Sequence, residues 1–374
     1  MNKQFSKTES GGHYYWLDLL RFIAAFAVMA CHFRGAFFEE YSNLPTSEHN
    51  PLTFSFYFIT RLGFEAVLVF FVLSGFLVGG KAITRIADGT FKVRDYAIDR
   101  FVRIMLPLVS SLLFYLPICI FFDIPIVVTD WLGSLFSLQG ILTQSAFATL
   151  WSLSYEVWFY ILMFSIGIVW TYNKKSITIG IVLLILCMLV FCKLKVSYLF
   201  VWLFGAIVFS KLKFADTSKN RILAIGAFIV SMFLIVLLQI SSGSRYLEST
   251  LVSNSEIFRD ILIILFGLTF SIFVRIIIEI IPHKRWVIKL NMIGTKLAAF
   301  SYTLYLTHAP VLRLLEHLGA PKSTSVNAVS LVLYMCWLAI GMIVAYVLYY
   351  IFEKNTPLVK RFLKSFLLKW IIAR

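Results

Sequence analysis

Long stretches of apolar residues, without the two-residue alternation of a half-buried strand, run through this chain from near its start to near its end. About 20 consecutive apolar residues are enough to cross a bilayer as an α-helix. The pattern predicts ten membrane-spanning helices, at residues 15–34, 56–79, 101–122, 150–170, 176–192, 197–210, 222–240, 259–281, 297–316 and 328–352. The fifth and sixth are the shortest.

A further apolar stretch, residues 123–149, contains Asp123, Pro125, Asp130 and Gly133. Charged and helix-breaking residues are unfavourable in a lipid-facing helix. We therefore expect an outer loop with a piece at the membrane interface. An eleventh span is the alternative.

The composition supports a membrane protein. Of the 374 residues, 60% are hydrophobic and only 14% are charged, whereas a soluble domain is roughly 45–50% apolar. So few charged residues could not cover the surface of a soluble fold. Because only helices and closed barrels satisfy their backbone in lipid, and the apolar runs do not alternate, we expect an all-α polytopic bundle of about ten transmembrane helices.

Basic residues set the expected orientation, because they collect on the cytoplasmic side of a membrane. With the N-terminus inside, the predicted inner segments hold 24 of the 34 Lys and Arg residues. Both termini are then cytoplasmic, in agreement with an even number of spans. This topology explains the net charge of +15, so nucleic acid is not an expected partner.

The sequence predicts one membrane domain over residues 1–357 and a basic amphipathic cytoplasmic tail over residues 358–374. In the tail, Leu358, Phe362 and Phe366 recur at helical spacing, with basic residues elsewhere on the wheel. Such a helix can lie on an anionic leaflet. A frayed basic tail is the alternative.

Five cysteines lie in or beside predicted spans, and their spacing is not that of metal ligands: Cys31, Cys119, Cys187, Cys192 and Cys336. We interpret them as small buried hydrophobic residues. No metal cofactor is expected.

Arg21 and His32 are polar residues inside the first predicted span. Eleven residues of α-helix turn through about three full turns and rise roughly 16 Å, so both side chains share one face. Charged residues in a span are costly and suggest function, and a neutral imidazole can act as a general base. A core histidine and an Asp18–Arg21 ion pair are the structural alternatives.

Arg100 and Arg103 lie three residues apart where the third span leaves the cytoplasm. Two guanidinium groups on one helix face suit a phosphorylated ligand. Ordinary anchoring of the span by snorkelling arginines is the alternative, and spacing alone favours it.

Glu156 begins an aromatic-rich span, and His308 lies two residues before Pro310. Glu156 could act as an acid or base, orient a histidine, or simply stabilise a helix N-terminus. Pro310 can open the helical hydrogen-bond ladder, which suits a cavity wall beside His308, although a packing kink explains it too. Ser74 precedes Gly75 and needs only close helix packing. A nucleophilic Ser74 is a weak alternative, since the usual turn motif is missing.

Taken together, these segments resemble the membrane-bound acyltransferase type 3 family. The matches in chain order are Leu17-Asp18-Leu-Leu-Arg21 with His32, Phe70-Phe71-Val-Leu-Ser-Gly-Phe76, Arg100-Phe-Val-Arg103 with Pro107, Trp151-Ser-Leu-Ser-Tyr-Glu156-Val-Trp-Phe-Tyr160, Ser301-Tyr302-Thr-Leu-Tyr305-Leu-Thr-His308-Ala-Pro310 and Phe352-Glu353-Lys354. Residues 171–295 match in hydropathy only. Some family members carry a fused esterase-like domain, which we do not expect here.

The resemblance implies an O-acyltransferase of the bacterial inner membrane. It would move an acyl group, acetyl or succinyl for example, from cytoplasmic acyl-CoA to a hydroxyl of an extracytoplasmic glycan such as O-antigen. The resemblance assigns catalysis to His32 and Arg21, and contact with the CoA phosphates to Arg100 and Arg103.

Three further residues are expected to contact the substrate, namely Tyr302, His308 and Ser74, and Glu156 is grouped with the catalytic residues. The acyl group, the acceptor sugar and the oligomeric state stay open.

Two other classes of function fit the same polar residues. One is a transporter or flippase for a glycan or small solute, because Arg21, His32 and Glu156 could line a polar path. The paired broken-helix signature of many transporters is not evident in this sequence. The other is a sensor or synthase subunit without turnover.

Overall fold

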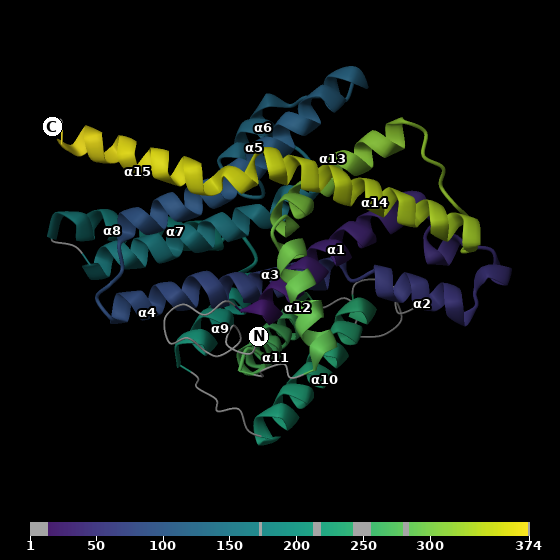
Figure 1. The fold of residues 1–374 in the computed structure, drawn as a ribbon, viewed down its shortest axis with the longest axis horizontal. Helices are drawn as coiled ribbons and strands as arrows, with labels where there is room; N and C mark the ends of the chain where they lie inside the picture. Colours follow the sequence, from purple (N-terminus) through teal and green to yellow (C-terminus); the bar gives the residue numbers. More distant parts are fainter. Residues whose placement is uncertain (1–13, 172–173, 212–217, 242–255, 280–283, 373–374) are drawn as a thin grey trace. The chain divides into compact units, whose positions relative to one another are not determined.

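The computed structural model describes residues 14–171, 174–211, 218–241, 256–279 and 284–372. Within these ranges the regular elements are helices, accompanied by two isolated β-bridges (Figure 1). This confirms the predicted all-α class. The described chain divides into two compact units, and α1 (Tyr15–Phe37) and α3 (Gly63–Ser74) each contribute residues to both.

The first unit comprises Met1–Ile23, Leu68–Gly89 and Lys195–Ala299. Its complete helices are η4 (Gly75–Gly80), α4 (Lys81–Ala87), α9 (Val196–Lys211), α10 (Ser218–Ser241), α11 (Glu256–Ile277) and α12 (Arg285–Ala298). The element η4 is a π-helix that continues α3. Helix α9 packs against both η4 and α11, and α10 packs against α11.

The second unit comprises Ala24–Val67, Thr90–Leu194 and Phe300–Arg374. Its complete helices are α2 (Pro51–Thr60), α5 (Val93–Phe121), α6 (Val128–Leu135), α7 (Trp151–Thr171), α8 (Lys174–Phe191), α13 (Ser301–His317), α14 (Ala328–Ile351) and α15 (Thr356–Ile372), with short 3₁₀ turns between some of them. Helix α13 packs against α5 and α14, and α7 packs against α8. The ring of Phe300 lies 5.7 Å from that of Tyr346, which places the start of α13 beside the end of α14 (Figure 1).

Each of the ten predicted spans overlaps helical residues, although the span predicted at 56–79 covers the end of α2, α3 and most of η4 instead of one helix. Seven helical segments in the described residues are long and apolar enough to cross a membrane, and Ile177–Phe191 and Val196–Ser210 are shorter apolar helices. The ninth predicted span corresponds to α13, which begins at Ser301 rather than 297 and has only 17 residues. Its Tyr, Thr and His side chains make α13 more polar than the other predicted spans. Most of α13 is buried inside the protein, away from lipid.

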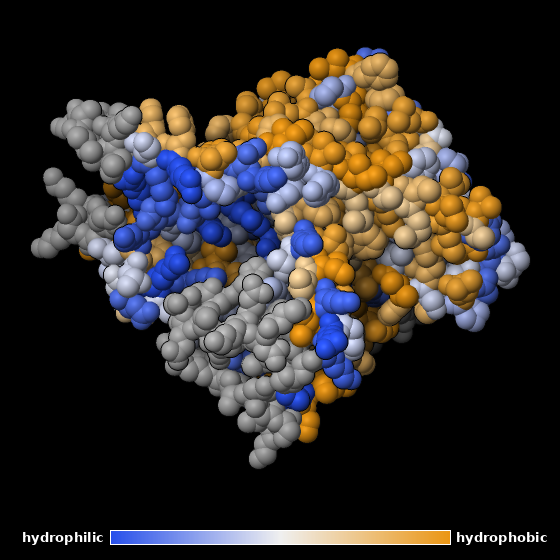
Figure 2. Space-filling view, viewed as in Figure 1, coloured by the Kyte–Doolittle hydropathy of each residue, from blue (hydrophilic) through white to orange (hydrophobic). Residues whose placement is uncertain are grey.

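The surface of these helices is largely apolar. Large hydrophobic side chains are exposed along α10 and α14, among them Ile222, Ile229, Phe233, Val332, Ile343 and Val347. Figure 2 shows broad hydrophobic areas on one face of the molecule. Apolar surface on this scale is expected where a helix contacts lipid instead of water. The protein is therefore a multi-pass membrane protein.

Within residues 123–149 the structure has the short helix α6, and residues 358–372 of the predicted tail belong to α15. Lys360 and Lys364 of α15 pair with Asp99 and Asp95 of α5, at N–O distances of 3.0 and 2.9 Å. The tail is thus tied to the beginning of α5 and is helical over the part that the structure describes.

In the first unit, glycines let α9 approach η4 at backbone distance. A Cβ atom on Gly75 would lie 1.9 Å from the carbonyl oxygen of Trp202, a backbone atom that cannot rotate away. The side chain next to it, Ser74, accepts a hydrogen bond from Trp202 Nε1 at 3.2 Å. Close packing is therefore the structural role of this Ser–Gly pair.

We expect Gly75→Val to destabilise the protein by about 1–3 kcal/mol or more, because the added methyl groups force η4 and α9 apart. The measurement is the midpoint of thermal unfolding of purified protein in detergent. Gly226→Ala in α10 is the control, since nothing lies within 4 Å of its added Cβ. An equal midpoint for Gly75→Val and wild type would contradict the close contact.

Candidate functional site

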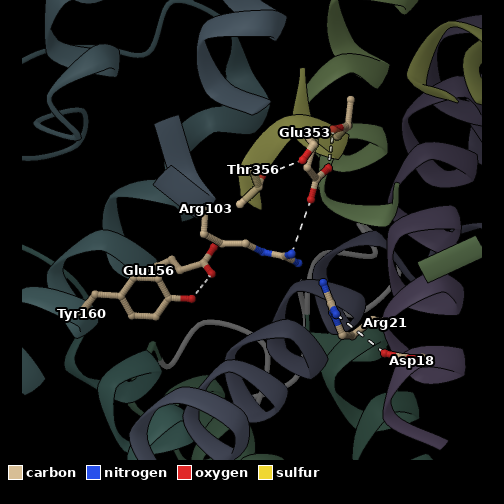
Figure 3. Close-up of polar contacts among 8 residues, drawn as sticks. Asp18, Arg21, Arg103, Glu156, Tyr160, Glu353 and Thr356 are labelled. Atoms are coloured by element: carbon tan, nitrogen blue, oxygen red, sulfur yellow. Dashed lines mark hydrogen bonds and ion pairs between the residues drawn. The ribbon is translucent and has the colours of Figure 1, made fainter. Parts of the chain in front are cut away.

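Helix α1 carries both Arg21 and His32, as the sequence predicts. Arg21 belongs to the first unit, where its Nη1 lies 3.8 Å from Oδ1 of Asp18, one turn earlier. Both side chains are partly accessible, with exposed fractions of 20% and 14%. The ion pair considered in the sequence is therefore present, and it holds the Arg21 side chain along α1 (Figure 3).

His32 belongs to the second unit, where it meets His308 of α13. The two imidazole rings lie 5.2 Å apart between centroids, at an interplanar angle of 37°. His32 is accessible, whereas His308 is completely buried. Sequence reasoning singled out both residues, but it could not show that they form a pair, because they come from helices at opposite ends of the chain.

The hydrogen bonding of His308 suggests its tautomer. Its Nδ1 lies 3.3 Å from the carbonyl oxygen of Leu304, which can only accept, so Nδ1 carries the proton in the neutral ring. Nε2 is then an acceptor, and it is buried without a hydrogen-bond partner. A neutral His308 thus presents an unused lone pair inside the second unit.

Helix α13 carries a row of aromatic and imidazole side chains, Tyr302, Tyr305 and His308, at three-residue intervals along one side. The ring of Tyr305 lies 5.9 Å from that of His308. Its hydroxyl is 2.5 Å from Ser152 Oγ and donates to the carbonyl oxygen of Thr149 at 3.2 Å. The row extends over about 9 Å of helix, and Tyr302 Oη is buried without a hydrogen-bond partner.

Arg103 of α5 reaches the other end of this row. Its guanidinium carbon lies 5.9 Å from the centroid of the Tyr302 ring, and its Nη1 lies 3.6 Å from Oε1 of Glu353. The Glu353 carboxylate is almost entirely buried, and its Oε2 accepts a hydrogen bond from Thr303 Oγ1 at 2.6 Å. The Glu353 backbone carbonyl accepts from Thr356 Oγ1 (Figure 3).

A second pair of contacts joins α5 to α7. The guanidinium carbon of Arg100 lies 5.7 Å from the centroid of the Tyr160 ring, and the Tyr160 hydroxyl donates a hydrogen bond to Glu156 Oε1 (Figure 3). The Tyr160 ring therefore contacts both Glu156 and Arg100, one of the two predicted phosphate-binding arginines. The Glu156 carboxylate thus accepts a hydrogen bond from Tyr160 of its own helix.

The second unit thus brings together His32 with His308, Arg103 with Tyr302, and Arg100 with Glu156 by way of Tyr160. Arg21 and Ser74 belong to the first unit. Ser74 accepts a hydrogen bond from Trp202 and begins the π-helix, so its described contacts are those of helix packing.

Sequence reasoning placed Glu353, Thr303 and Tyr305 within family motifs but gave none of them a role in the site. Glu353 is an acidic residue at the end of the last span, and a carboxylate at that depth was a signal for a basic partner. Thr303 and Tyr305 lay within a segment already recognised, but only the fold shows which helix each side chain faces. Among the described residues, no three His, Cys, Asp or Glu side chains gather as metal ligands would.

A family model described as an acyltransferase domain matches residues 14–353, nearly the whole chain. The chain therefore belongs to the acyltransferase type 3 family, which confirms the resemblance seen in its motifs, and it is a membrane acyltransferase. Comparison with curated proteins finds no match. Comparison with solved structures finds none either.

We expect Thr303→Val to lower the free energy of unfolding by about 1–2 kcal/mol, because the buried Glu353 carboxylate loses a hydrogen-bond donor while the shape of the side chain is kept. The measurement is thermal unfolding in detergent. Thr84→Val is the control, because the Thr84 hydroxyl bonds only to the carbonyl of Gly80 in its own helical segment. Equal losses for both variants would show that the contact with Glu353 contributes nothing.

Proposed function

We propose that this protein transfers an acyl group, acetyl in the simplest case, from cytoplasmic acyl-CoA to a hydroxyl of an extracytoplasmic glycan. The acceptor would be an O-antigen, an exopolysaccharide or a lipid-linked sugar, and the membrane a bacterial inner membrane. Membership of the acyltransferase family supports the reaction class. The donor, the acceptor and the roles of individual residues are the parts that we propose.

The observation that carries the proposal is the contact between His32 and His308. The His308 Nε2 lone pair has no hydrogen-bond partner in this structure, so a turn of the His32 ring would let one N–H of His32 donate to it and leave the other His32 nitrogen free to accept a proton. His308 would therefore hold His32 in the tautomer that a general base needs. His32 is the accessible member of the pair, so it is the one that can meet a sugar hydroxyl.

In this mechanism His32 removes the proton of the acceptor hydroxyl as its oxygen attacks the thioester carbonyl carbon. The carbon–sulfur bond then breaks, and the CoA thiolate leaves and takes up the proton from His32. Arg21, about 16 Å from His32 along α1, is our candidate for a contact on the acyl-donor side. Transfer through an acyl-histidine is a second route with the same overall balance.

The donor would bind through Arg100 and Arg103. Both guanidinium groups lie near the start of α5, on the side predicted to be cytoplasmic, and each lies over a tyrosine ring. A planar guanidinium supported on one face still presents its edge N–H groups to phosphate oxygens. Glu353 holds Arg103 in place, and the row from Tyr302 to His308 gives the acyl chain a lining that leads toward His32.

Glu156 would then act on the donor side through Tyr160, and Tyr302 would contact the acyl-CoA chain beside Arg103. We keep Ser74 as a proposed substrate contact.

We expect His32→Ala to lower acyl transfer at least about 100-fold, because the reaction loses its general base. The first measurement is glycan acylation in cells that make the variant at wild-type levels. The second is incorporation of label from radioactive acetyl-CoA into polysaccharide by isolated membranes. His317→Ala, an exposed histidine at the end of α13, is the control.

Retention of wild-type transfer by His32→Ala would overturn the assignment of the base. Absence of label in polysaccharide from wild-type membranes supplied with acceptor would instead favour the transporter or the subunit without turnover.

We expect the double variant Arg100→Ala, Arg103→Ala to bind acyl-CoA at least about 10-fold more weakly, since each arginine would contribute charge-assisted hydrogen bonds to phosphate. Equilibrium binding of acetyl-CoA to purified protein in detergent measures this. Arg361→Ala, an exposed arginine of α15, controls for a general loss of positive charge. Unchanged affinity for acetyl-CoA in the double variant would contradict the proposal and would mean that Arg100 and Arg103 only anchor the span in the membrane.

A further inference from the structure

The outer end of α1 carries an arginine that none of the steps above uses. Arg34 lies in the last turn of α1, two residues after His32, on the side of the membrane predicted to be extracytoplasmic. Its guanidinium carbon lies 5.1 Å from the centroid of the Tyr57 ring of α2. Its Nε is buried and has no hydrogen-bond partner.

Two acidic residues near Tyr57, Glu39 and Glu48, are engaged elsewhere. Glu39, whose carbonyl oxygen accepts from the Tyr57 hydroxyl, directs its carboxylate to Lys322 at 3.1 Å. Glu48 accepts a hydrogen bond from the backbone N–H of Val326 at 3.3 Å. In the part of the chain that the structure describes, no carboxylate lies within ion-pair distance of Arg34.

A second unpaired polar group lies on the same helix as Tyr57. Thr53 is completely buried, and its Oγ1 has no hydrogen-bond partner. It lies one turn before Tyr57, so both side chains are on one face of α2, and Arg34 contacts that face at the Tyr57 ring. The Arg34 Nε, a donor, and the Thr53 hydroxyl, which can donate or accept, are thus two buried polar groups without a hydrogen-bond partner.

Aromatic rings surround this place. The ring of Tyr41 lies 5.3 Å from that of Tyr57 and stacks on the imidazole of His49 at 4.8 Å. Flat apolar faces next to hydrogen-bond donors suit the apolar face and polar edge of a sugar ring. A helix C-terminus alone would favour a positive charge at Arg34, but it does not account for the unpaired Nε or for Thr53.

We propose that Arg34, Thr53 and Tyr57 form a binding site for an anionic group on the acceptor, so that the acceptor is an acidic saccharide. The anion is a carboxylate or a phosphate on a sugar ring, held by the guanidinium edge and the Thr53 hydroxyl. This proposal rests on the proposed function for its acceptor. We call the three residues the Arg34 site.

The position of Arg34 relative to His32 on α1 indicates how many sugar units the acceptor must have. Two residues of α-helix rise about 3 Å and turn through about 200°. Arg34 and His32 therefore lie at nearly the same depth but on opposite sides of α1. The anion bound at Arg34 and the hydroxyl activated at His32 belong to different sugar units of one acceptor.

The test is equilibrium binding of three probes to the purified full-length protein in lipid nanodiscs: glucuronate, glucose 1-phosphate and glucose. We expect wild type to bind at least one anionic probe, and Arg34→Gln to bind it at least 10-fold more weakly. Arg34→Lys, which keeps the charge, loses less, and Thr53→Val loses severalfold. Arg61→Gln, an exposed arginine just after α2, is the matched control and binds as wild type does.

Preference for glucuronate assigns a uronic acid to the acceptor, and preference for glucose 1-phosphate assigns a phosphorylated sugar. Equal binding of the anionic probes by Arg34→Gln and wild type, or no binding of either anion by wild type, overturns the proposal. If the anionic probes bind in an Arg34-dependent way but the protein transfers no acyl group, the Arg34 site is supported and the proposed function is wrong. Gel filtration detects a loss of folding in Arg34→Gln. In that case the binding of the anionic probes by Arg34→Lys and Thr53→Val decides whether the Arg34 site exists.

Discussion

A charge inside a membrane-spanning helix must find a partner, because lipid offers neither water nor counter-ions. This constraint organises the polar interior of the protein. Asp18 and Arg21 pair along α1, Arg275 of α11 pairs at 2.6 Å with Glu279 just after the end of that helix, and Arg103 of α5 lies 3.6 Å from Glu353 in the 3₁₀ turn after α14. The last of these joins distant parts of the chain, so it contributes to the arrangement of α5 and α13 as well as to neutrality.

Helix α13 is the element on which the second unit depends most. It is the most polar of the ten predicted spans, and twelve of its residues are buried. Its side chains connect the Arg103–Glu353 pair at one end with the His32–His308 pair at the other. Apolar side chains are directed to the lipid from α10 and α14, while tyrosine, threonine and histidine are kept inside on α13. That division is what an enzyme needs if a polar reaction is to proceed within a membrane and away from bulk water.

The two histidines of the second unit differ in a way that separates their roles. His308 is fully buried and is fixed by a contact with its own helix, whereas His32 is accessible. A buried base cannot reach a large glycan, and an accessible base with a freely rotating ring has no defined tautomer. In the proposed mechanism the contact between the two would combine access with orientation, and the proposed Arg34 site on the far side of α1 would recognise a second feature of the acceptor.

The amino-acid sequence by itself determined the class of fold, the approximate positions of the long apolar helices and the family, because hydropathy and motif order are local properties. Arg21, His32, Arg100 and Arg103 were recognisable since polar groups in apolar segments are rare. The tertiary structure alone decided which helices face one another. It paired His32 with His308, about 280 residues away in the chain, gave Arg103 the Glu353 carboxylate, and brought Ser74 to the indole N–H of Trp202. Such pairings depend on contacts between distant segments, and no short stretch of sequence encodes them.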